Sequence, residues 1–96
     1  MSEIKRLVLD VLKPHSPSIV ELSRRLGKLA GVLGVNCSVN EVDKDTESIK
    51  ITIEGHSISF DKVTETIEAM GAVIHSVDSV SAGKKIVEEV ETPQDR

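Results

Sequence analysis

Apolar side chains occupy both faces of the stretch 4–12 when it is laid out as a strand. The face that we expect to turn inward carries Leu7, Leu9 and Val11. Val8 and Leu12 lie on the opposite face, where an edge strand would carry polar residues. A strand that is apolar on both faces is usually central in its sheet, so we expect this one to be central.

Three further strands follow from alternation along the chain. Residues 35–40 and 49–54 each alternate between apolar and polar side chains, and the polar run 43–46 between them is turn-forming. This pattern is typical of an antiparallel hairpin with one buried face. Residues 73–80 form a last apolar-rich strand, although its alternation does not decide which side chains face the core.

Two other segments repeat apolar residues at spacings of three, four and three, which is the pattern of one helix face. We expect the first helix to have Ser16 as its N-cap and Pro17 at its first position, and to end at Gly31. The second is expected from about Phe60 to Met70, with Ser59 as its N-cap. The apolar faces are Ile19, Leu22, Leu26 and Leu29 in the first helix, and Phe60, Val63, Ile67 and Met70 in the second.

The order strand-helix-strand occurs twice, and Phe60 lies 41 residues after Ile19 at the equivalent place in the second half. This weak repeat predicts an α+β ferredoxin-like βαββαβ sandwich, in which a four-stranded antiparallel sheet of order 4-1-3-2 carries both helices on one face. The 96 residues are expected to form one domain, residues 1–96.

Residues 84–96 follow this complete fold and are expected to form an extra C-terminal strand and a tail. A fifth strand needs a sheet edge, and a neighbouring subunit can supply one. The uncovered sheet face also carries apolar side chains, which usually indicates a partner. We therefore expect a homo-oligomer, and head-to-tail contacts could close it into a ring. The alternative is that the segment folds back on its own sheet or frays.

Composition excludes several classes of function. A net charge of −4 and a single aromatic residue, Phe60, argue against nucleic-acid binding, and no apolar run is long enough to span a membrane. Cys37 is the only cysteine, which excludes an internal disulfide or a CxxC metal site and fits a reducing cytoplasm. It alternates inward, as a core residue does. The three histidines are too scattered for a zinc site.

Asp10 is the candidate for chemistry, because it lies in a strand expected to be central, on the face away from the helices. A buried carboxylate needs a partner. The neighbouring last strand carries His75 and Asp78, and one of them can face the same side. We expect Asp10, His75 and Asp78 to contribute to a hard-cation site, with Ca²⁺ as the candidate cofactor. The alternative is that these carboxylates are solvated, or form ion pairs with Arg6 or with lysines of a neighbouring subunit.

The turn Asp43-x-Asp45-x-Glu47 resembles the start of an EF-hand loop, but Ser48 replaces the glycine that the loop needs. Glu54, at the twelfth position, is expected at the far end of a strand. We therefore expect a solvated turn, and a loosely held surface ion at the hairpin tip stays open.

Five runs of residues together resemble the small archaeal proteins of domain-of-unknown-function family 211. They are Leu7 to His15, Gly31 to Asn36, Ile49 to Gly55, Ile74 to Asp78 and Val87 to Glu89. The resemblance covers nearly the whole chain. It implies a ferredoxin-like fold, an archaeal cytoplasmic protein, oligomeric rings and calcium in at least some members, and it implies no established activity.

Looser resemblances extend to ACT-like regulatory domains and to heavy-metal-associated domains, but the latter carry CxxC where this chain has residues 14–17. We therefore expect a non-enzymatic self-assembling module that binds Ca²⁺ or a small ligand. The alternative is an ACT-like sensor that binds an amino acid or metabolite between subunits, near Gly31 to Gly34. An enzyme that uses the Asp/His cluster is less favoured, since no nucleophile elbow, P-loop or dinucleotide fingerprint is present.

Overall fold

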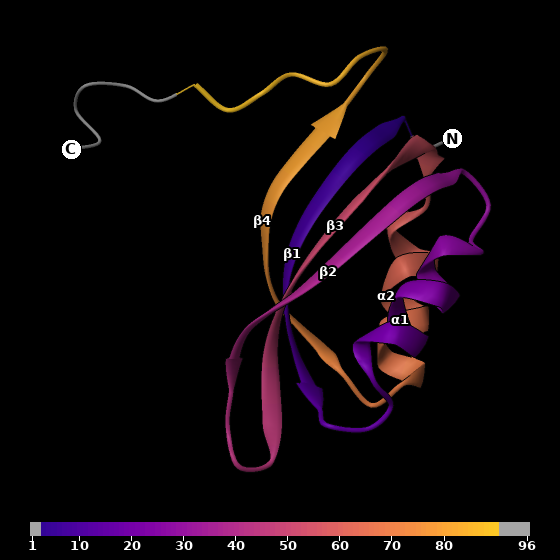
Figure 1. The fold of residues 1–96 in the computed structure, drawn as a ribbon. Coiled ribbons are helices and arrows are strands. Elements are labelled where there is room, and N and C mark those ends of the chain that lie inside the picture. The colour runs from indigo at the N-terminus through magenta and orange to yellow at the C-terminus, as the bar shows by residue number, and fades with distance from the viewer. Residues whose placement is uncertain (1–2, 91–96) are drawn as a thin grey trace.

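The helices and strands follow one another in the order βαββαβ in the computed structural model, which describes residues 3–90. The elements are β1 (Ile4–Pro14), α1 (Ile19–Gly27), β2 (Val32–Val42), β3 (Thr46–Ile58), α2 (Phe60–Ala69) and β4 (Val73–Ala82). Figure 1 shows both helices on the same side of the sheet. Within residues 3–90, neither helix is long and apolar enough to cross a membrane.

The four strands form one sheet in the order β2-β3-β1-β4, and every neighbouring pair is antiparallel. Read from the β4 edge, the same order is 4-1-3-2. β1 pairs with β3 on one side and with β4 on the other, so its prediction as a central strand is confirmed. The α+β class, with two helices and four antiparallel strands, is confirmed as well.

The core lies between the helices and the inward face of the sheet. β1 contributes three buried apolar side chains and β3 contributes four, and the helices close over them with the apolar faces that their periodicity predicts. Burial of each large apolar side chain contributes roughly 1.5–3 kcal/mol. Cys37 packs against this core as predicted, and burial raises the pKa of its thiol. The buried members are Leu7, Leu9, Val11, Ile49, Ile51, Ile53, Ile58, Leu22, Leu26, Val63, Ile67, Met70 and Ala72.

The first helix differs from the prediction at both ends. Its N-cap is Ser18, whose hydroxyl accepts a hydrogen bond from the Glu21 amide at 3.3 Å, and the helix ends at Gly27. Ser16 is wrong as the cap because the carbonyl of Pro17 turns away to accept a hydrogen bond from Lys13. The second helix begins as predicted, since Ser59 accepts a hydrogen bond from the Lys62 amide at 3.3 Å.

The expected extra C-terminal strand does not form in residues 84–90, so that prediction is wrong for the single chain. The chain turns at Gly83, which has a φ of 109°, and leaves the sheet, as the yellow end of the ribbon in Figure 1 shows. A strand needs an edge to pair with, and this segment has only an ion pair between Glu88 and Arg6 at 2.9 Å and a 3.3 Å bond from Ser81 to the Val87 carbonyl. Residues 91–96 of the expected tail lie outside the described residues.

The backbones of β3 and of the segment before β2 approach closely at Gly55. A Cβ atom at this position would lie 2.0 Å from the carbonyl oxygen of Gly31, which also accepts a hydrogen bond from the His56 amide at 2.7 Å. Only a glycine fits there. Gly34 differs, because a Cβ atom at that position would meet nothing within 4 Å.

We expect Gly55→Ala to destabilise the protein by more than about 1 kcal/mol, because the added methyl group forces two backbones apart. Gly34→Ala is the matched control, and we expect it to leave stability unchanged or slightly raised. Urea unfolding followed by circular dichroism measures both. Equal stability of the two variants would contradict the close approach.

Candidate functional site

The sheet face opposite the helices is uncovered and mixes apolar with charged residues. Leu12 is 41% exposed and its cross-strand neighbour Val73 is 52% exposed, while Val8 and Asp10 are partly buried on the same face. Large apolar side chains in such positions remain in contact with water in the single chain. The two pockets described below both open on this face, which we call the outer face.

An acidic pocket of about 230 Å³ lies at the end of the outer face where β1 finishes. Three carboxylates from β1, β2 and the following turn line it, together with a histidine from β4. His75 reaches the pocket because the β1–β4 pairing is irregular there: Asp10 pairs with Ser76 and Val11 with Ile74, which leaves His75 as an extra residue. The polar lining residues are Asp10, Glu41, Asp43, Ser48 and His75.

Two of the three predicted cation ligands therefore lie on one pocket. Asp10 accepts a hydrogen bond from Ser48 at 3.3 Å, and the residue opposite it on β3 is Lys50. Asp78 does not line this pocket, and its carboxylate accepts a hydrogen bond from Ser76 at 2.7 Å. In residues 3–90, no group of three or more His, Cys, Asp or Glu side chains is placed to hold a metal ion. This part of the chain alone therefore offers no complete coordination shell.

Glu41 is a pocket residue that the sequence pattern does not identify, whereas Asp43 belongs to the EF-hand-like turn that the sequence analysis singles out. They lie at the end of β2 and at the start of the turn, where alternation alone predicts solvated side chains. Asp43 closes the turn through its amide, which donates to the Thr46 carbonyl at 2.8 Å. Two other acidic residues of the EF-hand-like pattern have partners elsewhere, since Glu47 binds Lys13 and Glu54 binds Arg6.

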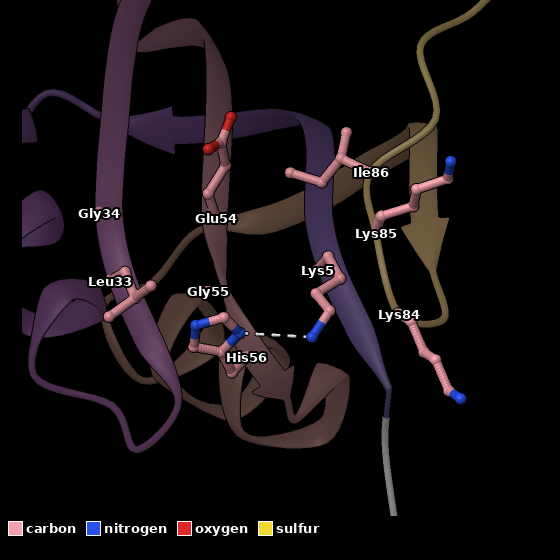
Figure 2. Close-up of a pocket in the computed structure, with 9 residues that line it drawn as sticks. All are labelled: Lys5, Leu33, Gly34, Glu54, Gly55, His56, Lys84, Lys85 and Ile86. Atoms are coloured by element: carbon pink, nitrogen blue, oxygen red, sulfur yellow. Dashed lines mark hydrogen bonds between the residues drawn. The ribbon is translucent and has the colours of Figure 1, made fainter.

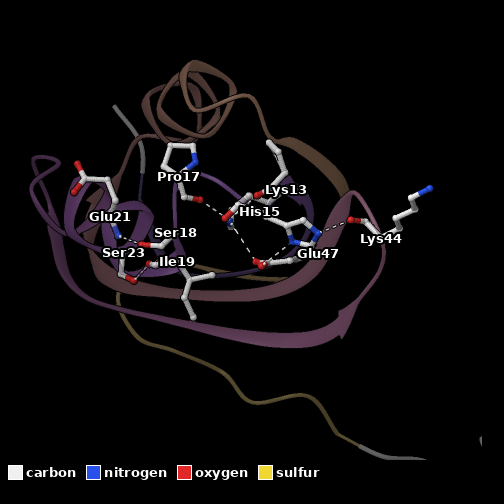
Figure 3. Close-up of polar contacts among 10 residues, drawn as sticks. Lys13, His15, Pro17, Ser18, Ile19, Glu21, Ser23, Lys44 and Glu47 are labelled. Atoms are coloured by element: carbon white, nitrogen blue, oxygen red, sulfur yellow. Dashed lines mark hydrogen bonds and ion pairs between the residues drawn. The ribbon is translucent and has the colours of Figure 1, made fainter.

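Lys13 is the most deeply buried charged residue in the part of the chain that the structure describes. It belongs to none of the motifs that the sequence analysis identifies. Its side chain is fully buried and its ammonium group donates to the carbonyls of Pro14 at 2.6 Å, His15 at 3.2 Å and Pro17. Glu47 lies 3.4 Å away and supplies a counter-charge. Figure 3 shows this group of contacts between the end of β1, the loop before α1 and the start of β3. Lys13 thereby donates hydrogen bonds to partly buried carbonyls of a loop whose prolines have no backbone N–H to pair with a neighbouring strand.

His15 extends this cluster to the surface. Its Nδ1 lies 3.2 Å from the Glu47 carboxylate and its Nε2 lies 2.9 Å from the Lys44 carbonyl. Both neighbours accept hydrogen bonds, so the doubly protonated ring satisfies both at once. The hydrogen bond to Glu47 and then that to Lys44 raise the pKa of His15 above 6.5, and the bond from His15 lowers the pKa of Glu47 below 4.5.

A second pocket, of about 430 Å³, opens at the other end of the outer face, where β1 begins. Figure 2 shows it between the ends of the strands and the segment that follows β4. The Nζ atom of Lys5 lies 3.3 Å from Nδ1 of His56. The lining residues are Lys5, Leu33, Gly34, Glu54, Gly55, His56, Lys84, Lys85 and Ile86, so basic side chains outnumber acidic ones.

Comparison with known proteins identifies relatives over the whole chain. Residues 5–96 match the model of the DUF211 family, described as "Uncharacterized ArCR". The chain is also 54% identical to an uncharacterized protein of Methanocaldococcus jannaschii over 96 residues, which cover 100% of this chain and 99% of that protein.

We expect the stability contributed by the His15–Glu47 pair to be greatest between about pH 4.5 and 6.5. The raised pKa of His15 stabilises the fold below 6.5, and that contribution is lost as the pH rises through the folded-state pKa. The lowered pKa of Glu47 acts above 4.5, and its contribution is lost as the pH falls through the folded-state pKa. His15→Gln should therefore lower Tm more at about pH 5.5 than at about pH 8. A Tm difference from the wild type that does not change with pH would contradict the pairing.

Proposed function

Because the chain belongs to the DUF211 family, whose description gives no activity, we propose from its own residues a non-enzymatic module that assembles with copies of itself through the outer face of the sheet. The element order and the strand order are those of a ferredoxin-like sandwich, in which two helices cover one face only. The exposed apolar side chains on the other face are the observation that carries the proposal.

The composition of the outer face supports a contact with another protein surface. Leu12 and Val73 are neighbours across β1 and β4, and Val8 adds a third apolar side chain on β1. Contact with a second copy removes such side chains from water and contributes roughly 25 cal/mol for each Å² of apolar surface. A second copy of this chain is favoured as the partner, because the segment after β4 does not pair with any strand of its own sheet.

The segment 84–90 supports the same reading. Val87 is 67% exposed and Val90 is 78% exposed, and neither belongs to a helix or strand. β2 and β4 each pair with only one neighbouring strand in the described chain, so each edge of the sheet presents backbone groups to a further strand. A segment of one copy that joins an edge of the next would bury these valines and pair its backbone.

The remaining parts of the proposal rest on the sequence. The chain carries no nucleophile elbow, P-loop or dinucleotide fingerprint, which favours a non-enzymatic role. The acidic balance and single aromatic residue favour a protein or small-ligand partner over nucleic acid. A lone cysteine fits the cytoplasm.

We expect the full-length protein to be oligomeric at micromolar concentration in light scattering after gel filtration. Leu12→Glu should shift it to smaller species, because the new carboxylate would have to be buried in the contact. Val20→Glu is the matched control, since Val20 is 62% exposed on α1, away from the outer face, and should leave the oligomer intact. A monomeric wild-type protein would end the proposal.

A second candidate function is the binding of a divalent cation at the acidic pocket. The observation that favours it is that Asp10, Glu41 and Asp43 line the same pocket, because carboxylate oxygens are the ligands that Ca²⁺ prefers. A neighbouring subunit or water would have to complete the shell. Lys50, which lies opposite Asp10 on β3, repels a bound cation because both are positively charged. Replacement of Lys50 by a neutral residue should therefore strengthen cation binding.

We expect Ca²⁺ to raise Tm, and Asp10→Asn to abolish the rise. At tenfold excess over Kd, stabilisation of about 1.4 kcal/mol follows from mass action, which raises Tm by roughly 4–8 °C per kcal/mol in a domain of this size. Differential scanning calorimetry measures the shift, since the chain has no tryptophan or tyrosine for fluorescence.

Asp78→Asn is the matched control for this titration, because Asp78 does not line the pocket and its loss should leave the calcium response unchanged. A Tm that no divalent cation changes would contradict the cation site. A rise in Tm with an amino acid and without metal would instead support the ACT-like sensor.

A further inference from the structure

Three neighbouring strands are irregular at the same level of the sheet. On β1, Ile4 pairs with Ala82 and Arg6 with Ser81, which leaves Lys5 as an extra residue. On β2, Val32 pairs with Gly55 and Gly34 with Glu54, which leaves Leu33 as another. Ser57 of β3 adopts a φ of 55°, which non-glycine residues rarely adopt. Bulges redirect side chains out of the regular alternation and are frequent beside binding sites.

Lys5 and Leu33, the two extra residues, line the 430 Å³ pocket at the beginning of β1, which we call the basic pocket. In Figure 2, Lys5 extends toward His56, Leu33 lies on the β2 side, and Ile86 extends toward β1 from the segment after β4. Lys84 and Lys85 extend outward from the same segment in that view. Pockets of this size hold small molecules, which bind to apolar walls and a few placed polar groups.

The charge of the basic pocket is positive once its ion pairs are counted. Glu54 is the only carboxylate among the lining residues, and Arg6 binds it at 2.8 Å. Arg6 lies outside the lining and is shared between Glu54 and Glu88, which it binds at 2.8 and 2.9 Å, so these three groups together carry one negative charge that the three lysines outweigh. The charges of Lys5, Lys84 and Lys85 remain. Lys84 and Lys85 are exposed, and their long stems reorient within nanoseconds, so a bound anion can draw their ammonium groups inward.

We propose that the basic pocket binds a small organic anion, a carboxylate or a phosphate monoester. Its anionic group lies at Lys5 and His56, and its apolar part packs against Leu33 and Ile86. The ammonium group of Lys5 has three protons, and the contact with His56 uses one of them. The others can donate charge-assisted hydrogen bonds to an anion, which are about twice as strong as bonds between neutral groups.

Gly34 lines the basic pocket from β2. It pairs with Glu54, so the side chain that it lacks would point to the outer face beside Glu54. A Cβ atom there meets nothing within 4 Å, and the backbone does not adopt a positive φ. A larger residue at this position therefore fills the pocket without straining β2. The place of Gly34 in the pocket also agrees with an ACT-like sensor, for which a ligand near Gly31 to Gly34 is expected.

The test is a calorimetric titration of the full-length protein with inorganic phosphate, glycerol 3-phosphate and succinate at low ionic strength. We expect saturable binding of at least one of the three, weakened by added salt. Binding of both phosphates but not succinate assigns a phosphate monoester, and binding of succinate alone assigns a carboxylate. No saturable binding of any of the three would overturn the proposal.

Two substitutions locate the site. Lys5→Gln should weaken binding about tenfold or more, as expected for the loss of a hydrogen bond from a charged group. Lys44→Gln changes the net charge equally at the hairpin turn, outside the lining, and should bind as the wild type does. Equal affinity of Lys5→Gln and the wild type would place the anion elsewhere and overturn the assignment.

Gly34→Val is a second test of the site, and it should also weaken anion binding. Valine favours strands, so this variant should keep the fold while its side chain blocks the pocket. Amide chemical shifts of Gly34 and Gly55 in the wild-type protein report whether the anion occupies this end of the sheet. Titration of Leu12→Glu in parallel separates the two proposals. Anion binding without an oligomer contradicts only the assembly, and an oligomer without anion binding contradicts only the basic pocket.

Discussion

Two short helices cannot cover both faces of a four-stranded sheet, and the organisation of this molecule follows from that constraint. The inward face is closed by Leu, Ile and Val from β1, β3 and both helices, and these side chains are almost completely removed from water. The outer face of the same central strand carries Val8, Asp10 and Leu12. Both pockets and the proposed contact surface therefore share one side of the protein, which Figure 1 shows as the side away from α1 and α2.

The pockets lie where strand pairing becomes irregular. Regular alternation sends every second residue to the core and leaves a flat outer face. An extra residue in β4 brings His75 to the acidic pocket, and extra residues in β1 and β2 bring Lys5 and Leu33 to the basic pocket. Core packing tolerates these bulges because the apolar pattern resumes beyond them, with Leu7 and Ile53 fully or almost fully buried.

Periodicity was sufficient to predict the four paired strands, the two helices and the central position of β1, because burial acts on every second residue of a strand and on every third to fourth residue of a helix. It was not sufficient for the expected extra strand in residues 84–90, which has no sheet edge to pair with in the single chain. It could not place the bulges, which depend on backbone pairing between distant strands, and so it left the facing of His75 open and did not find Glu41. It also missed Lys13, although this residue continues the inward series of Leu7, Leu9 and Val11. A lysine at a core position indicates a buried polar contact. The partners of Lys13 are backbone carbonyls, which every residue has, so the sequence does not show which residues supply them.

The two pockets have opposite charge and lie at opposite ends of β1, roughly 17 Å apart at about 3.3 Å per residue between Lys5 and Asp10. If two outer faces met with like ends together, carboxylates would face carboxylates and lysines would face lysines, at a cost of several kcal/mol. In the proposed assembly, copies whose Asp10 end meets a Lys5 end would avoid that cost, so charge would select the relative orientation while apolar side chains supply the attraction. A divalent cation at the acidic pocket would remove the repulsion between acidic ends, and an anion in the basic pocket would do the same at the other end. If both proposals hold, ligand binding and assembly would be linked through the same two groups of charges, and occupancy of either pocket would change which orientation is favoured.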